Sequence, residues 1–180
     1  CHGFLSCRPV GAEDFAAVYK NNAASTPGVS EEAPDDLRMF VGLGTCLIAE
    51  GDGKVLGFLN LIPPGTMAYK SLNLRWFEAW LEANPVKLNY VDRIALAPEA
   101  RGKGVGPQLY KAAFEHSEGC DAIGCEVNTA PDNPGSHRFH KRLGFAEVGR
   151  QAFSPEKAVA YYAVSYKQLT LPERGPGGEA

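Results

Sequence analysis

The sequence lacks a long apolar run, a recognisable leader segment and an excess of positive charge. No stretch approaches the roughly 20 consecutive apolar residues that a transmembrane helix requires. The N-terminal segment is too short and too mixed in character for a secretory signal. The formal net charge of -3 at pH 7 provides no cationic surface for nucleic acid or for an anionic membrane. We therefore expect a cytoplasmic protein with no nucleic-acid partner and no membrane partner.

The sequence also lacks a metal-binding pattern. Its five cysteines form neither a Cys-x-x-Cys pair nor a Cys/His ligand spacing. An odd number of cysteines without a secretory signal favours a reducing compartment. Cys7, Cys46 and Cys125 lie in apolar segments, which predicts small core residues. We expect no metal cofactor.

The composition is that of an ordinary globular protein. The 180 residues are 44% hydrophobic and 22% charged, which suffices for one domain with a substantial core. The last residues, rich in glycine and proline, are typical of a flexible segment. We predict a single domain over residues 1–169 and a flexible C-terminal tail over residues 170–180.

A glycine-rich segment lies at the centre of the sequence, YVDRIALAPEARGKGVG over residues 90–106. Its first seven residues include hydrophobic and β-branched side chains and predict a strand, which Pro98 ends. Apolar residues at helical spacing predict a helix over residues 107–117. A helix N-terminus offers unpaired N–H groups and the positive end of the helix dipole, and glycines allow a phosphate to approach the backbone. Together with Arg101 and Lys103, this arrangement predicts a pyrophosphate site.

The glycine spacing excludes two common phosphate motifs. A P-loop requires Ser or Thr after its Gly-Lys pair, whereas Lys103 is followed by Gly104. The dinucleotide motif requires GxGxxG within alternating βα units, whereas Gly102, Gly104 and Gly106 are spaced GxGxG. A nucleoside triphosphatase and a dinucleotide-dependent enzyme are therefore disfavoured.

The remaining chain alternates between strand and helix patterns. The predicted strands cover residues 4–9, 46–50, 55–62, 122–128, 145–152 and 159–166, and the predicted helices cover residues 9–23, 32–43 and 137–143. Residues 66–84 contain both tryptophans, and Leu72, Trp76, Phe77 and Trp80 fall at helical spacing. This segment is a short amphipathic helix packed on the sheet, or else a lid in which Arg75 pairs with a carboxylate of the substrate.

Glu126 is a single acidic residue in an otherwise apolar predicted strand. A carboxylate among Ile123, Cys125 and Val127 requires an explanation, since burial of an unpaired charge is costly. It faces solvent by alternation, pairs with a structural cation, or serves as a general base. The sequence leaves these three alternatives open.

Two motifs carry a resemblance to a known family. Arg-x-x-Gly-x-Gly, after a strand ending Ile94-Ala95-Leu96-Ala97-Pro98, resembles the acetyl-CoA signature of the GNAT superfamily of N-acetyltransferases. The segment from Asn133 to Phe139-His140-Lys141-Arg142-Leu143-Gly144-Phe145 resembles the family pattern in which an Asn opens a helix ending Tyr-x-x-x-Gly-Phe. The stretches 73–77, 90–94 and 139–140 are further similar to a branch of bacterial GNAT proteins.

The resemblance implies an α/β GNAT acyl-CoA N-acyltransferase fold, with a mixed, mostly antiparallel central sheet flanked by helices. It implies transfer of an acetyl group from acetyl-CoA to a primary amine of a small molecule or peptide by direct attack. Two alternatives stay open: a non-catalytic acyl-CoA-binding regulatory module, and an acyltransferase that uses a longer acyl chain. A homodimer is compatible with the family.

The resemblance also implies roles for particular residues. Backbone groups of the fourth strand and of the glycine-rich loop would bind the cofactor, with further contacts from the helix near residue 133. These residues are Ile94, Ala95, Leu96, Arg101, Gly102, Lys103, Gly104, Val105, Gly106, Asn133, Ser136 and His140.

For catalysis, the resemblance implies a general base and a general acid. Glu126 matches the glutamate that ribosomal-protein alanine acetyltransferases carry in a Leu-Glu-Val strand, and Asp92 is the competing candidate. His140 replaces the family's tyrosine, so it is the candidate that protonates the departing thiolate. Tyr110, Tyr161 and Tyr162 are other phenols that could do so, whereas His116 and His137 are predicted to be exposed.

Overall fold

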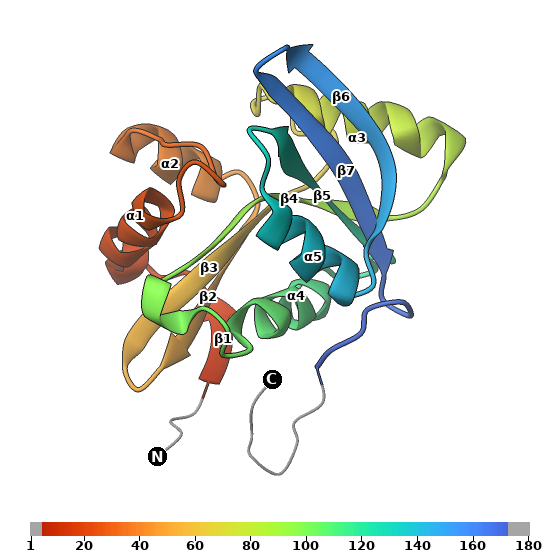
Figure 1. The fold of residues 1–180 in the computed structure, drawn as a ribbon. Helices are drawn as coiled ribbons and strands as arrows, with labels where there is room; N and C mark the ends of the chain where they lie inside the picture. The colour runs from red at the N-terminus through yellow and green to blue at the C-terminus, as the bar shows by residue number, and fades with distance from the viewer. Residues whose placement is uncertain (1–4, 173–180) are drawn as a thin grey trace. The chain divides into compact units, whose positions relative to one another are not determined.

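A computed structural model describes residues 5–172 of the chain (Figure 1). Seven strands form one sheet in the order β1-β2-β3-β4-β5-β7-β6. The strands are β1 (Leu5–Pro9), β2 (Thr45–Gly51), β3 (Lys54–Ile62), β4 (Leu88–Leu96), β5 (Ala122–Ala130), β6 (Ala146–Ser154) and β7 (Lys157–Ser165). Neighbours pair antiparallel in β1–β2, β2–β3, β5–β7 and β6–β7, and β4 pairs with β5 in parallel over Leu88–Tyr90. The predicted mixed, mostly antiparallel sheet is confirmed.

Five helices connect these strands. They are α1 (Phe15–Ala24), α2 (Pro34–Val41), α3 (Leu72–Ala83), α4 (Val105–Glu115) and α5 (Pro134–Arg142), and two short 3-10 turns cover Ala12–Asp14 and Pro98–Ala100. Residues 66–84 therefore contain the predicted amphipathic helix, which Ser71 caps by accepting hydrogen bonds from the backbone N–H groups of Asn73 and Leu74. In the part of the chain that the structure describes, none of these helices has the length and apolar character needed to cross a membrane.

The chain divides into two compact units. The first contains the chain up to Ile62 and residues 91–118, and the second contains residues 63–90 and 119–170. Strand β4 contributes its first three residues to the second unit and the others to the first. Most of the predicted tail, residues 173–180, lies outside the described residues, and the single-domain prediction stays a prediction.

In the first unit, α1 and α2 cover one face of the strands. Val18 of α1 and Leu37 of α2 are fully buried, and they pack with Cys46, Ile48 and Phe58 in one core cluster. Because side chains alternate along a strand, Leu47 and Leu59 point to the opposite face. Helix α4 contacts β1, β2 and β3 there and buries most of its own residues.

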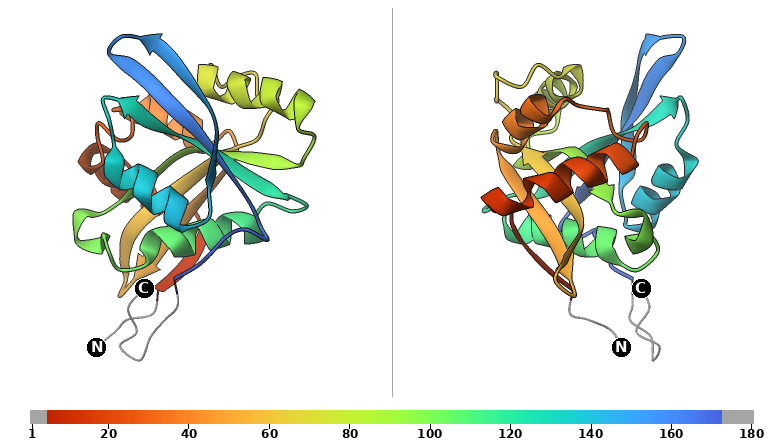
Figure 2. Two further views of the ribbon diagram at one scale, coloured as in Figure 1. Left: turned by 45° about the vertical axis from the view of Figure 1, so that its right-hand side comes forward. Right: turned by 90° about the vertical axis from the view of Figure 1, so that its left-hand side faces the viewer.

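In the second unit, α3 and α5 cover opposite faces of β5, β6 and β7 (Figure 2). Trp76 of α3 stacks on Tyr161, with ring centroids 4.0 Å apart. Tyr162, which follows Tyr161 on β7, donates a hydrogen bond from its hydroxyl to His137 of α5. Two consecutive residues of β7 therefore serve two different helices, as the alternation of a strand requires.

Glycines on the α3 face make room for the aromatic side chains of α3. A Cβ at Gly149 would lie 2.2 Å from the Trp76 ring, and a Cβ at Gly124 would lie 2.6 Å from the Phe77 ring. Gly149 and Tyr161 are register partners, so the indole covers both of them. Close contact of α3 with this face therefore depends on the absence of a side chain at these two positions.

The predicted helix over residues 137–143 begins earlier in the structure. Asn133 accepts a hydrogen bond from the backbone N–H of Ser136, 3.3 Å away, and so caps α5. Pro134 follows at the first helical position, where its missing N–H costs little. The cap and the proline together explain the earlier start.

We predict that Gly149→Ala lowers the free energy of unfolding by about 1–3 kcal/mol, because the added methyl group displaces the Trp76 ring from its stack on Tyr161. Urea unfolding followed by tryptophan fluorescence measures this loss. Gly135→Ala in α5 is the matched control, since its Cβ would meet only an Arg138 nitrogen at 3.9 Å. Equal stability of the two variants would contradict the packing described here.

Candidate functional site

The glycine-rich loop of the first unit connects β4 to α4. Gly102 and Gly104 adopt positive φ values of 75° and 79°, a conformation that side chains with a Cβ rarely adopt. Gly104 is the N-cap residue of α4 and brings no side chain to cap it. The N–H groups of the first turn consequently remain available to a ligand, because an α-helix provides them with no internal partner. The predicted strand–loop–helix arrangement is confirmed.

The environment of the loop suits an anion. The side chains of Arg101 and Lys103 are exposed beside it. A Cβ at Gly102 would meet no atom within 4 Å, so the space in front of this residue is open. Arg101 also donates a hydrogen bond to the carbonyl of Ala24 at 3.3 Å, which links the loop to the end of α1. The open position at Gly102, two cations and an uncapped helix N-terminus fit a pyrophosphate.

Strand β4 presents Ile94, Ala95 and Leu96 directly before this loop. Ala95 is buried, whereas Ile94 and Leu96 are partly exposed. Gly57 of β3 lies close to this strand end, since a Cβ there would be 2.8 Å from the Ala95 carbonyl oxygen. Leu96 therefore ends β4 in a tightly packed part of the first unit, immediately before the loop.

The predicted cofactor residues of α5 lie in the second unit. Ser136 donates its backbone N–H to the Asn133 side chain, and its carbonyl oxygen accepts a hydrogen bond from His140 Nδ1 at 2.8 Å. The Ser136 hydroxyl lies 3.3 Å from the same nitrogen. Asn133, Ser136 and His140 therefore hold one another within a single short helix, and their role in binding a cofactor stays a prediction.

His140 is in the neutral form at neutral pH. It is buried, and this burial lowers its pKa to about 4, although the bond to Ser136 acts in the opposite direction. A neutral imidazole has one proton, and the bond to the Ser136 carbonyl places that proton on Nδ1. The other ring nitrogen then carries no proton, so His140 acts as an acceptor there unless it is first protonated.

Asp92 lies in a buried ionic network of the first unit. Its carboxylate accepts hydrogen bonds from Arg93 Nε at 2.7 Å and from Asn60 Nδ2 at 3.1 Å. Arg93 is also buried and reaches Glu32 at 3.0 Å and Asn22 Oδ1 at 3.0 Å. Although burial acts to lower the pKa of Arg93, the Asp92 and Glu32 carboxylates raise it. The Asp92 carboxylate thus compensates the charge of the buried Arg93 guanidinium. This salt bridge is the structural alternative to a role of Asp92 as catalytic base.

Glu126 lies on the α3 face of β5 and is partly exposed. It accepts a hydrogen bond on Oε1 from the hydroxyl of Tyr90. Tyr161 is its register partner on β7, and burial together with the Glu126 charge raises the pKa of that phenol. The carboxylate therefore lies among phenol groups.

The Tyr161 hydroxyl lies between two amides. It is 2.7 Å from Asn73 Oδ1 and 2.8 Å from Gln151 Oε1. A phenol has a single proton, so one amide accepts it while the other turns its NH2 group toward the phenol oxygen. These groups form a polar cluster beneath the aromatic rings of α3.

Arg75 does not serve as a carboxylate receptor in the described second unit. Its guanidinium donates to the carbonyls of Thr66 at 2.8 Å and Tyr69 at 3.3 Å, and its Nε lies 3.1 Å from Glu78. Glu78 in turn accepts a hydrogen bond from the backbone N–H of Gly65 at 2.6 Å. These bonds fix the segment before α3 to the helix, in agreement with a structural arginine.

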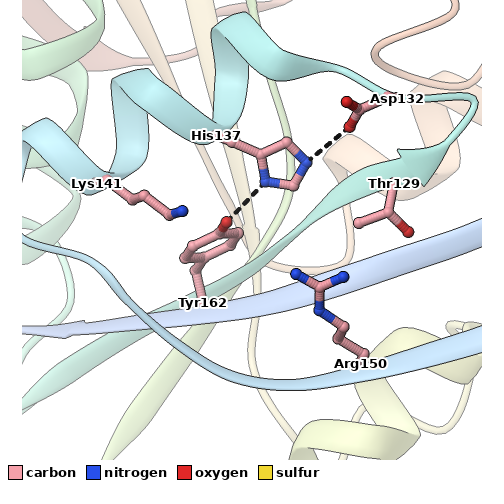
Figure 3. A pocket seen from close by; sticks show the side chains of 6 residues that line it. All are labelled: Thr129, Asp132, His137, Lys141, Arg150 and Tyr162. Carbon is pink, nitrogen blue, oxygen red and sulfur yellow. Dashed lines mark hydrogen bonds and ion pairs between the residues drawn. The ribbon is translucent and has the colours of Figure 1, made fainter.

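A polar hollow of about 320 Å³ lies on the α5 face (Figure 3). It is lined by Thr129, Asp132, His137, Lys141, Arg150 and Tyr162. Figure 3 shows His137 between Asp132 and Tyr162. His137 Nε2 lies 2.9 Å from the Asn128 carbonyl and 3.3 Å from Asp132, and its Nδ1 lies 2.7 Å from the Tyr162 hydroxyl. The prediction that His137 is exposed is wrong, because it ties α5 to β5 and β7.

Sequence reasoning missed the partners of Glu126. The sequence pattern predicts only a strand for Tyr90 and gives no site role to Gln151. The contact of Tyr90 with Glu126 could have been inferred from a parallel pairing of β4 with β5. In such a pairing Tyr90 lies opposite Gly124, and Glu126 lies two residues further along β5 on the same face. No signal could show that Tyr161, Asn73 and Gln151 meet, because they come from β7, α3 and β6.

Over the residues that the structure describes, no three His, Cys, Asp or Glu side chains gather in a group that could hold a metal ion. The four described cysteines are all free thiols. Burial raises the pKa of Cys46 to about 12, so this residue remains a neutral core thiol.

Comparison with known proteins gives a consistent result. The model of the acetyltransferase (GNAT) family matches residues 15–145. The chain is 24% identical over 181 residues to the L-methionine sulfoximine/L-methionine sulfone acetyltransferase of Pseudomonas aeruginosa, and the match covers 92% of this chain and 94% of that protein. It is 33% identical over 84 residues to an N-acetyltransferase of Streptomyces griseus. That match spans 47% of this chain and only 43% of the Streptomyces protein.

A solved structure shares the fold. The spermidine N-acetyltransferase from Vibrio cholerae, in complex with CoA and spermine, superposes with a TM-score of 0.65. The match covers 91% of this chain and 96% of the other, with 18% sequence identity. At this identity the likeness concerns the fold alone.

We predict that His140 makes the free energy of unfolding depend on pH between 4 and 6.5. In that range the unfolded chain binds a proton that the folded chain does not, so stability falls as the pH decreases from 6.5 toward 4. The contribution is about 1.4 kcal/mol per pH unit. Urea unfolding at pH 5 and pH 7 should show a smaller decrease in His140→Gln than in the wild-type protein.

His116→Gln is the control for this measurement, since His116 is exposed. It should keep the wild-type dependence on pH. A decrease of the same size in His140→Gln and in the wild-type protein would mean that His140 binds its proton equally well in the folded and unfolded states.

Proposed function

The chain belongs to the acetyltransferase (GNAT) family, and on this premise we propose that it transfers an acetyl group from acetyl-CoA to a primary amine. Acetyl-CoA supplies the acetyl group as an activated thioester. The observation that carries the proposal is the glycine-rich loop before α4, where two positive-φ glycines precede an uncapped helix N-terminus. Backbone N–H groups at this position bind phosphate oxygens and form no bond to a particular base.

The proposal assigns cofactor binding to backbone groups. Gly102 to Gly106 would hold the pyrophosphate through N–H groups, with Arg101 and Lys103 adding positive charge. Ile94, Ala95 and Leu96 would hold the pantetheine arm through their peptide groups. Asn133 and Ser136 would contribute near the thioester from α5. These assignments follow the family pattern and are supported by the conformation of the loop.

The proposal assigns the general base to Glu126. A base must be deprotonated and must reach the amine proton, and Glu126 is a partly exposed carboxylate that accepts a hydrogen bond from the neutral Tyr90 phenol. Asp92 is the weaker candidate, because removal of its charge from the network would leave Arg93 buried without compensation. Because its ring is neutral, His140 would offer a hydrogen-bond acceptor and not a proton for the departing thiolate.

The acceptor is proposed as an amine of a small molecule. Relatives are named for methionine sulfoximine and methionine sulfone, for phosphinothricin and for spermidine. These names span amino-acid-like amines and polyamines. Because Arg75 is bound to backbone carbonyls of its own segment, it is not our candidate for an acceptor carboxylate.

Two experiments test the proposal in sequence. Thermal melting with acetyl-CoA, CoA and longer acyl-CoA thioesters measures cofactor binding, since a ligand at 100 times its Kd adds about 2.7 kcal/mol of stability. Release of the CoA thiol is then followed with methionine sulfoximine, phosphinothricin, spermidine and spermine. Binding without thiol release from any amine would favour a non-catalytic acyl-CoA module. A larger shift of the melting temperature with a longer acyl-CoA would assign that thioester, in place of acetyl-CoA, as the acyl donor.

We predict that Gly104→Glu abolishes acetyl-CoA binding, because it brings a side chain and a negative charge to a left-handed position at the helix N-terminus. Isothermal titration calorimetry measures the loss. Gly119→Glu is the control, since Gly119 also has a positive φ of 72° but lies in a turn beside Lys87. Undiminished affinity in Gly104→Glu would contradict the assignment of the loop.

We predict that Glu126→Gln lowers kcat by about 10²–10⁴-fold while acetyl-CoA affinity is retained, which is the range of general-base catalysis. Asp92→Asn should instead lower the free energy of unfolding by about 3–5 kcal/mol, because it breaks a buried ion pair. Steady-state kinetics and urea unfolding of both variants separate the two roles. The reverse outcome would assign the base to Asp92.

A further inference from the structure

Tyr90 lies directly beside the proposed base. In the parallel pairing of β4 with β5, Tyr90 is the register partner of Gly124. Glu126 follows Gly124 by two residues, and alternation places it on the same face of β5. Since Gly124 has no side chain, nothing on β5 separates the Tyr90 ring from the Glu126 carboxylate.

The Tyr90 ring is held on several sides. It is fully buried, and its centroid lies 5.8 Å from that of Phe77 and 6.3 Å from that of Tyr69. Tyr69 is itself buried, and the hydrogen bond from Arg75 to its carbonyl fixes its backbone. A ring packed in this way has little freedom to rotate, so the position of its hydroxyl is well defined.

The hydroxyl of this ring donates to Glu126 Oε1. A carboxylate has two oxygens and about four lone-pair positions, and the bond from Tyr90 occupies only one of these positions. The donor is neutral and buried, which distinguishes it from a lysine or arginine that would neutralise the base. The bond can therefore orient the carboxylate without removing its charge.

We propose that Tyr90 is a positioning residue for Glu126, whose hydroxyl holds the carboxylate in the orientation that accepts the proton of the acceptor amine. The proposal rests on the proposed function, which assigns the general base to Glu126. It adds a residue of β4 that acts on the reaction only through the carboxylate.

Removal of the Tyr90 hydroxyl should lower turnover only while the Glu126 carboxylate is present. Tyr90→Phe removes one oxygen and keeps the ring, so the packing against Phe77 and Tyr69 is retained. Glu126 then samples orientations that do not reach the amine. The free energy of a hydrogen bond to a charged group corresponds to a factor of roughly 10 to 100 in a rate constant. We therefore expect kcat to fall by this factor, while the KM for the acceptor changes little.

The first measurement needs no acceptor. In protein labelled with ¹³C at the glutamate side chains, the Glu126 signal is identified by its loss in Glu126→Gln. Loss of a donor to the charged form should move the titration midpoint of this signal upward by about one pH unit in Tyr90→Phe. Tyr161→Phe is the matched control, since its hydroxyl is bonded to Asn73 and Gln151 instead. It should leave the midpoint near its wild-type value.

The second measurement is a double-mutant cycle on turnover, with the amine from the panel above that releases thiol fastest. Tyr90→Phe should lower kcat in the wild-type background and change it by less than about twofold in the Glu126→Gln background. An equal factor in both backgrounds would mean that Tyr90 acts through the fold, and this overturns the proposal.

The two readouts separate failure of the proposal from failure of the proposed function. An unchanged titration midpoint in Tyr90→Phe overturns the positioning role, whatever the activity of the variants. A shifted midpoint together with full turnover in Glu126→Gln would show that the pair exists and that Glu126 is not the base. That result removes the assignment on which the positioning role rests.

Discussion

The cost of removing charge from water is the constraint on which the site depends. A buried ionisable group must be paired or neutral, and the interior of this protein contains examples of both. Asp92 and Arg93 are paired with each other, whereas His140 is neutral because burial lowers its pKa to about 4. Glu126 differs from these residues, because it is partly exposed and its described partner is a phenol. This difference distinguishes the proposed base from acids and imidazoles that serve the fold.

The alternation of side chains along strands explains how one sheet supports different tasks. On β7, Tyr161 faces α3 and the polar cluster, whereas Tyr162 faces α5 and His137. The α3 face combines aromatic packing with Glu126, and glycines at the contact points allow the helix to approach closely. Because packing and chemistry share this face, substitutions there need controls that separate stability from turnover, which is the reason for pairing Tyr90→Phe with Tyr161→Phe.

The candidate groups of the two compact units are of different kinds. In the first unit, the relevant groups belong to the backbone: glycines of left-handed conformation and the first N–H groups of α4. In the second unit they are side chains, with Glu126 and its phenol partner on β5 and β4. Backbone recognition depends on loop conformation and tolerates varied side chains, so a family can keep its cofactor while its acceptors differ.

The sequence by itself determined the order of the elements, the glycine-rich loop and the helix that follows it. These features depend on local rules, namely residue periodicity, glycine conformation and helix capping, which a short window of sequence contains. Only the tertiary structure decided which polar residues are committed to the fold. Asp92 lies next to Arg93 in sequence, yet their burial depends on Asn22 and Glu32 from a distant segment. Likewise, the phenol that meets Glu126 comes from another strand, because register and packing are long-range properties that no single segment specifies.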